Sequence, residues 1–282
     1  MAIGDFTRIY TNINAFNALA ALKSVARNSA KVQLKLATGL RINEVADDPA
    51  GFVLSQNLNA RTRGLSVALD NIGTAKNVLS IAEGGLLNIG DILITVKEKV
   101  TQAASDTLGS SERNAIKTEI DELTEEIDDI VSETSFNGRK LINGTFTGIS
   151  IQTGEKPTNT LRINLTQNVE VSGIGVPSTE VSQRVFTAAG SSSALAKVDL
   201  ALEKVNGLVQ EVGAISSRLT VKENTVETSI INTEATRSRI RNADFARLQL
   251  ESIRNTIIQR TSTSVLAQAN ILPFSVLSLF RR

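Results

Sequence analysis

The sequence predicts a mainly α-helical protein, in which a long coiled-coil-like helical bundle carries a small β-hairpin region and further helices lie at both ends. Apolar residues recur in alternating steps of three and four along three long stretches, which is typical of packed helices. Between the second and third stretch the pattern changes to alternation, with Asn-Gly turns. Aromatic residues make up only 4% of the 282 residues, so Leu, Ile, Val and Ala must supply the core.

The first stretch is an unbroken seam of about five heptads. It predicts one long helix that begins near Pro49 and ends near Ser105. Asp48 followed by Pro49 is typical of an N-cap and a first helical residue, although Asp47 and Asp48 could also form a carboxylate pair for acid/base chemistry. The residues of this seam are Ala68, Ile72, Ala75, Leu79, Ala82, Leu86, Ile89, Leu93, Val96, Val100 and Ala103.

Two further seams predict the other helices of the bundle. One contains Ile116, Ile120, Leu123, Ile127 and Ile130, and the other contains Val198, Leu202, Val205, Val209 and Val212. A generic helical bundle would show the same periodicity, so these seams predict architecture and not function. The side chains expected to meet in the bundle are Leu79, Leu86, Leu93, Ile120, Leu123, Ile127 and Val205. Gly84 and Gly85 interrupt a helix at about 1 kcal/mol each against Ala, which indicates close packing by a neighbouring helix or subunit.

Residues 135–190 predict one or two β-hairpins. Residues 149–151 and 161–165 alternate like strands, and the Asn-Gly pairs at 137–138 and 143–144 suit tight turns. A loop around Pro177 is expected to lead into the third long helix. Three serines at 191–193 are expected to cap that helix.

The composition argues against an enzyme, a cofactor and a metal centre. The chain has no His and no Cys, so the commonest general base, the commonest metal ligands and disulfides are excluded. A run of carboxylates could suggest Ca²⁺, but it lacks the spacing of a calcium-binding loop, and a solvated helix face explains it better. That run contains Asp121, Glu122, Glu125, Glu126, Asp128 and Asp129.

Basic residues gather near both ends, which raises the possibility of nucleic-acid binding. The formal net charge is only +1 and stacking aromatic residues are missing, so a polar surface between subunits explains the arginines better. The basic residues of the two ends are Arg8, Lys23, Arg27, Lys31, Lys35, Arg237, Arg239, Arg241, Arg247, Arg254 and Arg260.

Both ends contain long uncharged segments, residues 9–22 and 261–280. A membrane span is rejected because Gln268, Asn270, Pro273 and several hydroxyl residues make the second segment too polar. The apolar residues instead form helix faces that need a protein partner, which suggests polymerisation. These residues are Ile9, Ile13, Phe16, Leu19, Leu22, Val265, Leu266, Leu272, Val276, Leu277 and Phe280.

Four motifs carry a resemblance to a known family. Residues 37–43 (ATGLRIN) and 46–51 (ADDPAG) closely resemble the N-terminal signature of bacterial flagellins. Residues 238–246 (SRIRNADFA) and 263–270 (TSVLAQAN) resemble the C-terminal signature, and the chain ends as flagellins do, with Phe280 where Leu is usual. The chain is therefore identified as resembling the flagellar filament subunit.

The resemblance implies two domains in a minimal flagellin. The ends, residues 1–44 and 236–282, would pair as helices of the inner-tube domain D0. Residues 45–190 would supply the long helices and β-hairpins of the outer-tube domain D1, and residues 191–235 its C-terminal helix. The family's variable outer domains have almost no room.

The resemblance also implies partners and a location. The chain would polymerise with itself into a helical homopolymer for motility, and would be secreted to the extracellular flagellum. A flagellar secretion chaperone and the type III export apparatus would handle it before assembly, and the filament cap and hook-associated proteins would meet it there. The N-terminus lacks a signal-peptide pattern, which fits export by a route other than the general secretory one. No nucleic acid, membrane or metal partner is expected.

Two further expectations depend on the family. A flagellar hook–filament junction protein shares flagellin-like ends and is the alternative identity, although the full C-terminal signature and the short insert favour the filament subunit. Many flagellins are sensed by a Toll-like receptor through an Arg-x-x-x-Leu pair and a Glu. The corresponding positions here are Thr95, Lys99 and Glu119, so this receptor epitope is degenerate.

Overall fold

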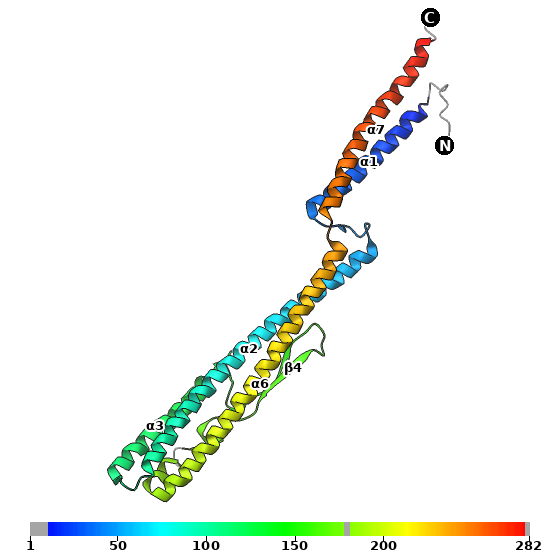
Figure 1. Ribbon diagram of the computed structural model, residues 1–282. Coiled ribbons are helices and arrows are strands. Elements are labelled where there is room, and N and C mark those ends of the chain that lie inside the picture. The colour runs from blue at the N-terminus through cyan, green and yellow to red at the C-terminus, as the bar shows by residue number, and fades with distance from the viewer. Residues whose placement is uncertain (1–10, 178–180, 280–282) are drawn as a thin grey trace. The chain divides into compact units, whose positions relative to one another are not determined.

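A computed structural model describes residues 11–177 and 181–279 (Figure 1). The chain divides into two compact units. Unit 1 comprises residues 1–60 and 232–282, and unit 2 comprises residues 61–231. The predicted fold class is confirmed: long helices dominate and the described sheets are two small antiparallel pairs.

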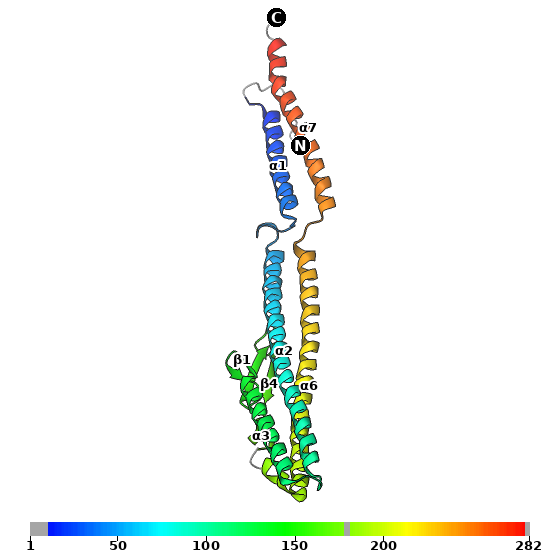
Figure 2. The same cartoon turned by 90° about the vertical axis from the view of Figure 1, so that its left-hand side faces the viewer.

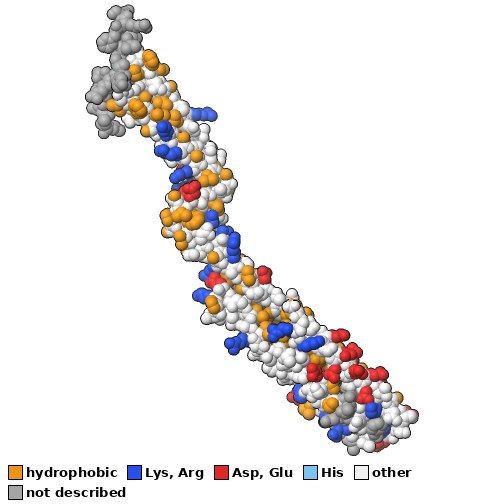
Figure 3. Space-filling view, turned by 180° about the vertical axis from the view of Figure 1, so that it is seen from behind, with side chains coloured by type: hydrophobic (Ala, Val, Ile, Leu, Met, Phe, Trp, Pro, Cys, Tyr) orange, Lys and Arg blue, Asp and Glu red, His pale blue; other side chains and the backbone are white. Residues whose placement is uncertain are grey.

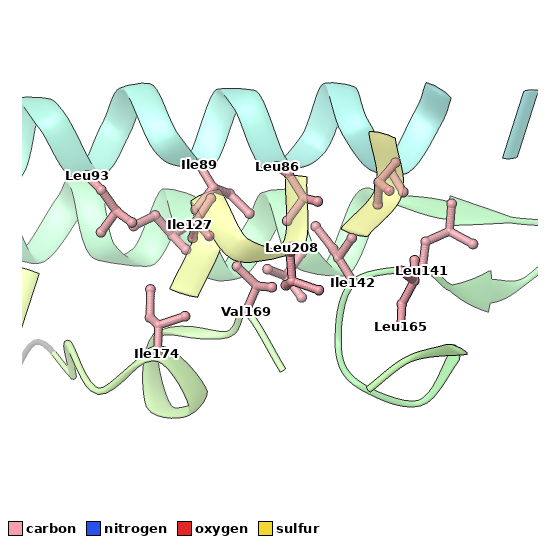
Figure 4. Close-up of a cluster of buried hydrophobic side chains, with 14 of the residues drawn as sticks. Leu86, Ile89, Leu93, Ile127, Leu141, Ile142, Leu165, Val169, Ile174 and Leu208 are labelled. Carbon is pink, nitrogen blue, oxygen red and sulfur yellow. The ribbon is translucent and has the colours of Figure 1, made fainter. Parts of the chain in front are cut away.

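Unit 2 is built on three long helices, which lie side by side in both ribbon views (Figures 1 and 2). They are α2 (Pro49–Ala103), α3 (Ser110–Glu133) and α6 (Ala188–Arg241). Residues 49–60 of α2 and 232–241 of α6 belong to unit 1. The three seams face one core (Figure 4). Leu79, Leu86, Leu93, Ile120, Ile127 and Val205 are fully or almost fully buried there, whereas Leu123 is only partly buried and packs against the core from its edge.

Ion pairs also join the three helices of unit 2. Lys76 Nζ lies 2.6 Å from Glu223 Oε2 and Lys97 Nζ lies 2.7 Å from Asp199 Oδ1, which links α2 to α6. All four side chains are partly exposed, and such pairs contribute about 0–1 kcal/mol each. Burial of the apolar seams therefore contributes most of the stability of the bundle.

Two β-hairpins cover part of the bundle, as the alternating sequence predicts. Strand β1 (Ser135–Phe136) pairs with β2 (Arg139–Lys140), and β3 (Phe146–Gln152) pairs with β4 (Thr160–Leu165), both antiparallel. The first turn is left-handed at both central residues, with φ of 49° at Asn137 and 78° at Gly138, which is the geometry that a two-residue Asn-Gly hairpin requires. In β4 every second side chain joins the core, namely Leu161, Ile163 and Leu165.

The segment before α6 differs in part from the prediction. Residues 175–177 are neither helix nor strand, as the predicted loop around Pro177 requires, but a short helix α4 (Val171–Ile174) precedes them and a 3₁₀-helix η1 (Ser182–Phe186) lies between the loop and α6. Helix α6 begins at Ala188, so the serines at 191–193 lie inside it and do not cap it. The cap is Thr187, whose extended backbone suits an N-cap and whose Oγ1 accepts a hydrogen bond from Gly190 N at 3.1 Å.

The two adjacent glycines of α2 have different surroundings. A Cβ atom at Gly85 would lie 2.6 Å from Thr134 Oγ1, just after α3, so close packing by a neighbouring segment is confirmed there. A Cβ atom at Gly84 would meet no described atom within 4 Å. Gly84 therefore has no packing reason within the described part of the chain.

Helix α2 is long and apolar enough to cross a membrane by length and composition alone. Its apolar seam, however, supplies much of the core of unit 2, from Leu65 to Ala103. The helix is accordingly a core helix of the bundle.

Unit 1 contains α1 (Ile13–Thr38) and α7 (Phe245–Leu279), which lie side by side (Figures 1 and 2). Asn12 caps α1, because its Oδ1 accepts from Ala15 N at 3.0 Å, and its Nδ2 donates to Ala269 O of α7 at 2.7 Å. Gly39 ends α1 with φ of 70°, a left-handed conformation that glycine adopts without strain.

Candidate assembly surface

The connector between α1 and α2 is hydrogen-bonded to the connector between α6 and α7. Arg41 N donates to Arg241 O at 2.7 Å, and Ala243 N donates to Gly39 O at 3.0 Å. The guanidinium of Arg41 also donates to Ile240 O, at 2.6 Å from Nη2. Two segments about 200 residues apart in sequence are thus tied together by main-chain bonds. The RIN and RIRNA parts of the two sequence signatures form this connection.

The two aspartates of the ADDP motif have structural roles. Asp48 Oδ1 accepts from Gly51 N at 2.9 Å, which confirms the predicted cap of α2. Asp47 Oδ2 accepts from Asn43 N at 3.1 Å and from Glu44 N at 3.3 Å. The hydrogen bond from Asn43 lowers the pKa of Asp47 below its ordinary value, and the nearby Lys35 ammonium acts in the same direction.

The interface between α1 and α7 is sparsely packed. Among the described residues of these two helices, the buried side chains are Ala18, Ser29, Val32, Asn255 and Ala269. Most of them are small or polar. One copy of unit 1 therefore buries much less apolar surface than unit 2, whose core cluster runs the length of its three helices.

A second apolar stripe on α7 has no partner within the described chain. Leu250, Ile253 and Ile257 follow each other in steps of three and four, and Ile271 and Phe274 continue the apolar series farther along the helix. All are exposed, Leu250 and Phe274 to 71% each. Figure 3 shows apolar side chains gathered on the surface of this unit. We call Leu250, Ile253, Ile257, Ile271 and Phe274 the outer stripe; an exposed stripe of this kind marks a protein-binding surface.

The predicted end faces are placed unevenly. Ile13, Phe16 and Val265 are exposed, whereas Leu19, Leu22 and Leu266 are partly buried. Ile9 and Phe280 lie outside the described residues, as do the side chains of Leu272, Val276 and Leu277. The sequence analysis did not predict the outer stripe, although its spacing is readable, because the stripe begins among arginines, outside the uncharged segment 261–280.

Most basic residues in the described part of unit 1 form no ion pair there. Arg237 pairs with Glu234, and this contact raises the pKa of Arg237 and lowers that of Glu234. Within the described chain no ion pair involves Arg239, Arg247, Arg254 or Arg260. These guanidinium groups are available for contacts outside their own subunit.

The three positions of the degenerate receptor epitope lie on α2 and α3. Lys99 Nζ is 2.5 Å from Glu119 Oε1, so these two side chains bind each other. Thr95 donates through Oγ1 to Asp91 O of its own helix at 3.0 Å. The acidic run on α3 is mostly exposed, as expected for a solvated face, although Asp128 Oδ1 accepts from Val171 N at 2.8 Å.

One buried cation escaped sequence reasoning. Arg113 near the start of α3 is 7% exposed, and its guanidinium donates to four carbonyl oxygens. Nη1 reaches the Ala103 carbonyl at the end of α2 and the Val185 carbonyl of η1 at 3.2 Å, while Nη2 reaches the Ser105 carbonyl at 2.8 Å. The weaker fourth bond joins Nε to Leu108 O at 3.4 Å. Arg113 thus joins α2, the connector and η1 at this end of unit 2.

Comparison with known proteins points to one family. The family model for the bacterial flagellin N-terminal helical region matches residues 9–147, and that for the C-terminal helical region matches residues 195–280. A flagellin of Bacillus subtilis is 32% identical, with 97% of this chain and 100% of that protein covered. The flagellar filament 41 kDa core protein of Borreliella burgdorferi is 27% identical, with coverage of 96% and 98%.

The solved structures show the same fold. A structure of a putative flagellar hook-associated protein from Vibrio parahaemolyticus superposes with a TM-score of 0.59. It covers 70% of this chain and 100% of that one, at 16% sequence identity. At this identity the likeness concerns the fold alone.

Proposed function

Because the chain belongs to the bacterial flagellin family, we propose that unit 1 carries the surface through which its subunits assemble. The chain itself is a structural subunit that polymerises into the bacterial flagellar filament, and not an enzyme. The outer stripe on α7 is the observation that supports the proposal, because its large apolar side chains lie exposed in the single chain.

The physical mechanism is burial of the outer stripe by neighbouring subunits. Covering one Ile, Leu or Phe side chain contributes about 1.5–3 kcal/mol, so five such residues supply a substantial driving force. We propose that Ile13, Phe16 and Val265 take part as well, together with Ile9, Leu19, Leu22, Leu266, Leu272, Val276, Leu277 and Phe280. A contact of this kind is heterologous and does not close, so it generates an open helical filament.

We further propose that the domains are those of a minimal flagellin. Domain D0 would comprise residues 1–44 and 236–282, and D1 would comprise residues 45–190 and 191–235. The two compact units divide at 60/61 and 231/232 instead. The difference concerns residues 45–60 and 232–235, which we assign to D1.

The partners and the route out of the cell are also proposals. Subunits would leave through the flagellar type III export apparatus with a secretion chaperone, and would reach the extracellular filament under its cap. Hook-associated proteins would contact the first subunits. The sparse α1–α7 interface supports this view, because weakly packed ends unfold at little cost for export.

The coupling of folding to assembly has a direct test. In the unassembled subunit the α1–α7 pair is expected to open readily, so trypsin should cut after Arg247, Arg254 and Arg260 within minutes. In filaments verified by electron microscopy the same sites should be protected at least about 100-fold. Arg218, which lies exposed on α6 of unit 2, is the internal control and should change little. Equal cleavage of α7 in subunit and filament would contradict the proposal.

The degenerate epitope gives a second prediction. We propose that Thr95, Lys99 and Glu119 make the chain a weak agonist of the flagellin-sensing Toll-like receptor. Thr lacks the forked donors of Arg. The Glu119 carboxylate, which a receptor would need to contact, is already bound by the Lys99 ammonium of the same chain. The Thr95→Arg, Lys99→Leu double variant should raise reporter-cell potency at least about tenfold. Lys97→Leu, which breaks the pair with Asp199, is the matched control and should leave potency unchanged.

A further inference from the structure

The two units carry opposite charge, although the whole chain is nearly neutral. Unit 1 has 14 Lys and Arg against 7 Asp and Glu, whereas unit 2 has 16 against 22. A filament that packs copies of unit 1 together concentrates this positive charge. Repulsion among like charges opposes such packing unless anions neutralise them.

A groove between α1 and α7 collects part of that charge. It has a volume of about 560 Å³ and is lined by Asn28 of α1 and by Arg247, Glu251, Arg254 and Asn255 of α7. Within the described chain neither arginine forms an ion pair, and with the Glu251 carboxylate in the same lining the groove keeps a net positive charge. Two guanidinium groups at one groove form a fork-shaped set of donors suited to oxyanions.

A buried amide in the same groove lacks a partner. The side chain of Asn255 is 9% exposed, and its Nδ2 has no hydrogen-bond acceptor in the described structure. A buried donor without an acceptor costs about 1–3 kcal/mol. An acceptor that reaches this donor from the groove would remove the penalty.

We propose that this groove binds a divalent oxyanion of the sulfate or phosphate class, held by Arg247, Arg254 and the Asn255 amide. Leu250, the first residue of the outer stripe, also lines the groove. The anion therefore lies beside the surface proposed for assembly and favours packing of neighbouring copies by neutralising the two arginines. This effect on the filament rests on the proposed function. The binding site itself lies within one chain, between its own α1 and α7.

The test uses assembled filaments of the full chain and radiolabelled sulfate as the probe. Filaments pelleted at millimolar sulfate should retain one sulfate per subunit in a saturable manner. Unlabelled phosphate should displace it, whereas sodium chloride at the same ionic strength should not. Millimolar sulfate should also raise the temperature at which filaments dissociate, again in contrast to chloride. Absence of saturable binding, or displacement by chloride as effective as by phosphate, would overturn the inference.

Two variants locate the site. Arg254→Gln should weaken sulfate binding at least about tenfold, because one fork of donors is lost. Arg260→Gln removes an equal charge from the same helix outside the groove and should bind sulfate like the wild type; equal weakening by both variants would refute the groove as the site. If the Arg254→Gln variant forms no filaments, the displacement of labelled sulfate from wild-type filaments by phosphate, and not by chloride, still tests whether the site exists. Wild-type protein that forms no filaments would count against the proposed function, and filaments that bind no sulfate against this inference alone.

Discussion

Replacing Arg113 by Met should lower the free energy of unfolding of unit 2 by about 3–5 kcal/mol. Met keeps much of the aliphatic packing but removes a buried guanidinium that donates to carbonyls of α2, the α2–α3 connector and η1. The Ala103 and Val185 carbonyl oxygens would then lose a buried donor, and leaving a buried acceptor unpaired costs about 1–3 kcal/mol. Urea unfolding of the unassembled subunit, followed by the helical circular-dichroism signal, measures the change.

Two controls separate this role from a general effect of charge. Arg218→Met removes an arginine that is exposed on α6 and forms no ion pair within the described residues, and it should change stability by less than about 0.5 kcal/mol. Arg113→Lys keeps the positive charge but cannot reach four acceptors with one ammonium group, so its loss should be intermediate. An Arg113→Met protein that unfolds at the wild-type urea concentration would show that water satisfies these carbonyls.

Regular packing was the part of this fold that could be predicted from the sequence. Leu93 and Ile127 sit in unbroken three-four patterns, and both are fully buried because helix periodicity alone determines which side chains face inward. The Asn137-Gly138 turn was equally readable, since few residue pairs adopt its two positive φ angles. Leu123 shows the limit of this reasoning. It belongs to the seam but is only partly buried at the edge of the core. Periodicity predicts which face of the helix a side chain is on, but not how far the neighbouring elements cover that face.

The features that escaped prediction depend on a contact distant in sequence, on a competing local cap and on the rotation of a helix pair. Arg113 gives no local signal, because one of its acceptors, Val185 O, lies 72 residues away. Ser191 resembles a cap, but Thr187 precedes it and caps the helix first. Which residues of α1 and α7 form the assembly surface stays a prediction. Whether an apolar residue on α7 faces α1 or solvent depends on the rotation of the pair, and an uncharged segment does not specify this rotation.

Replacing Ile257 by Asp should abolish filament growth while leaving the subunit folded. Ile257 is 59% exposed in the single chain, and Ile and Asp differ little in helix propensity, so neither α7 nor unit 2 should lose stability. In the filament the same position is proposed to be covered. The variant would then lose about 1.5–3 kcal/mol of apolar burial and would place an unpaired carboxylate in the contact, at several kcal/mol more.

The measurement is the critical concentration for growth on filament seeds, which should rise at least about 100-fold because each 1.4 kcal/mol corresponds to a factor of ten. Gln259→Asp introduces the same charge two residues farther along α7, off the outer stripe, and should assemble with a critical concentration within a few-fold of the wild type. Circular dichroism of both unassembled variants should match that of the wild type. Normal growth of Ile257→Asp would mean that the outer stripe faces solvent in the filament as well. In that case the contact between subunits must rest on the opposite side of the α1–α7 pair.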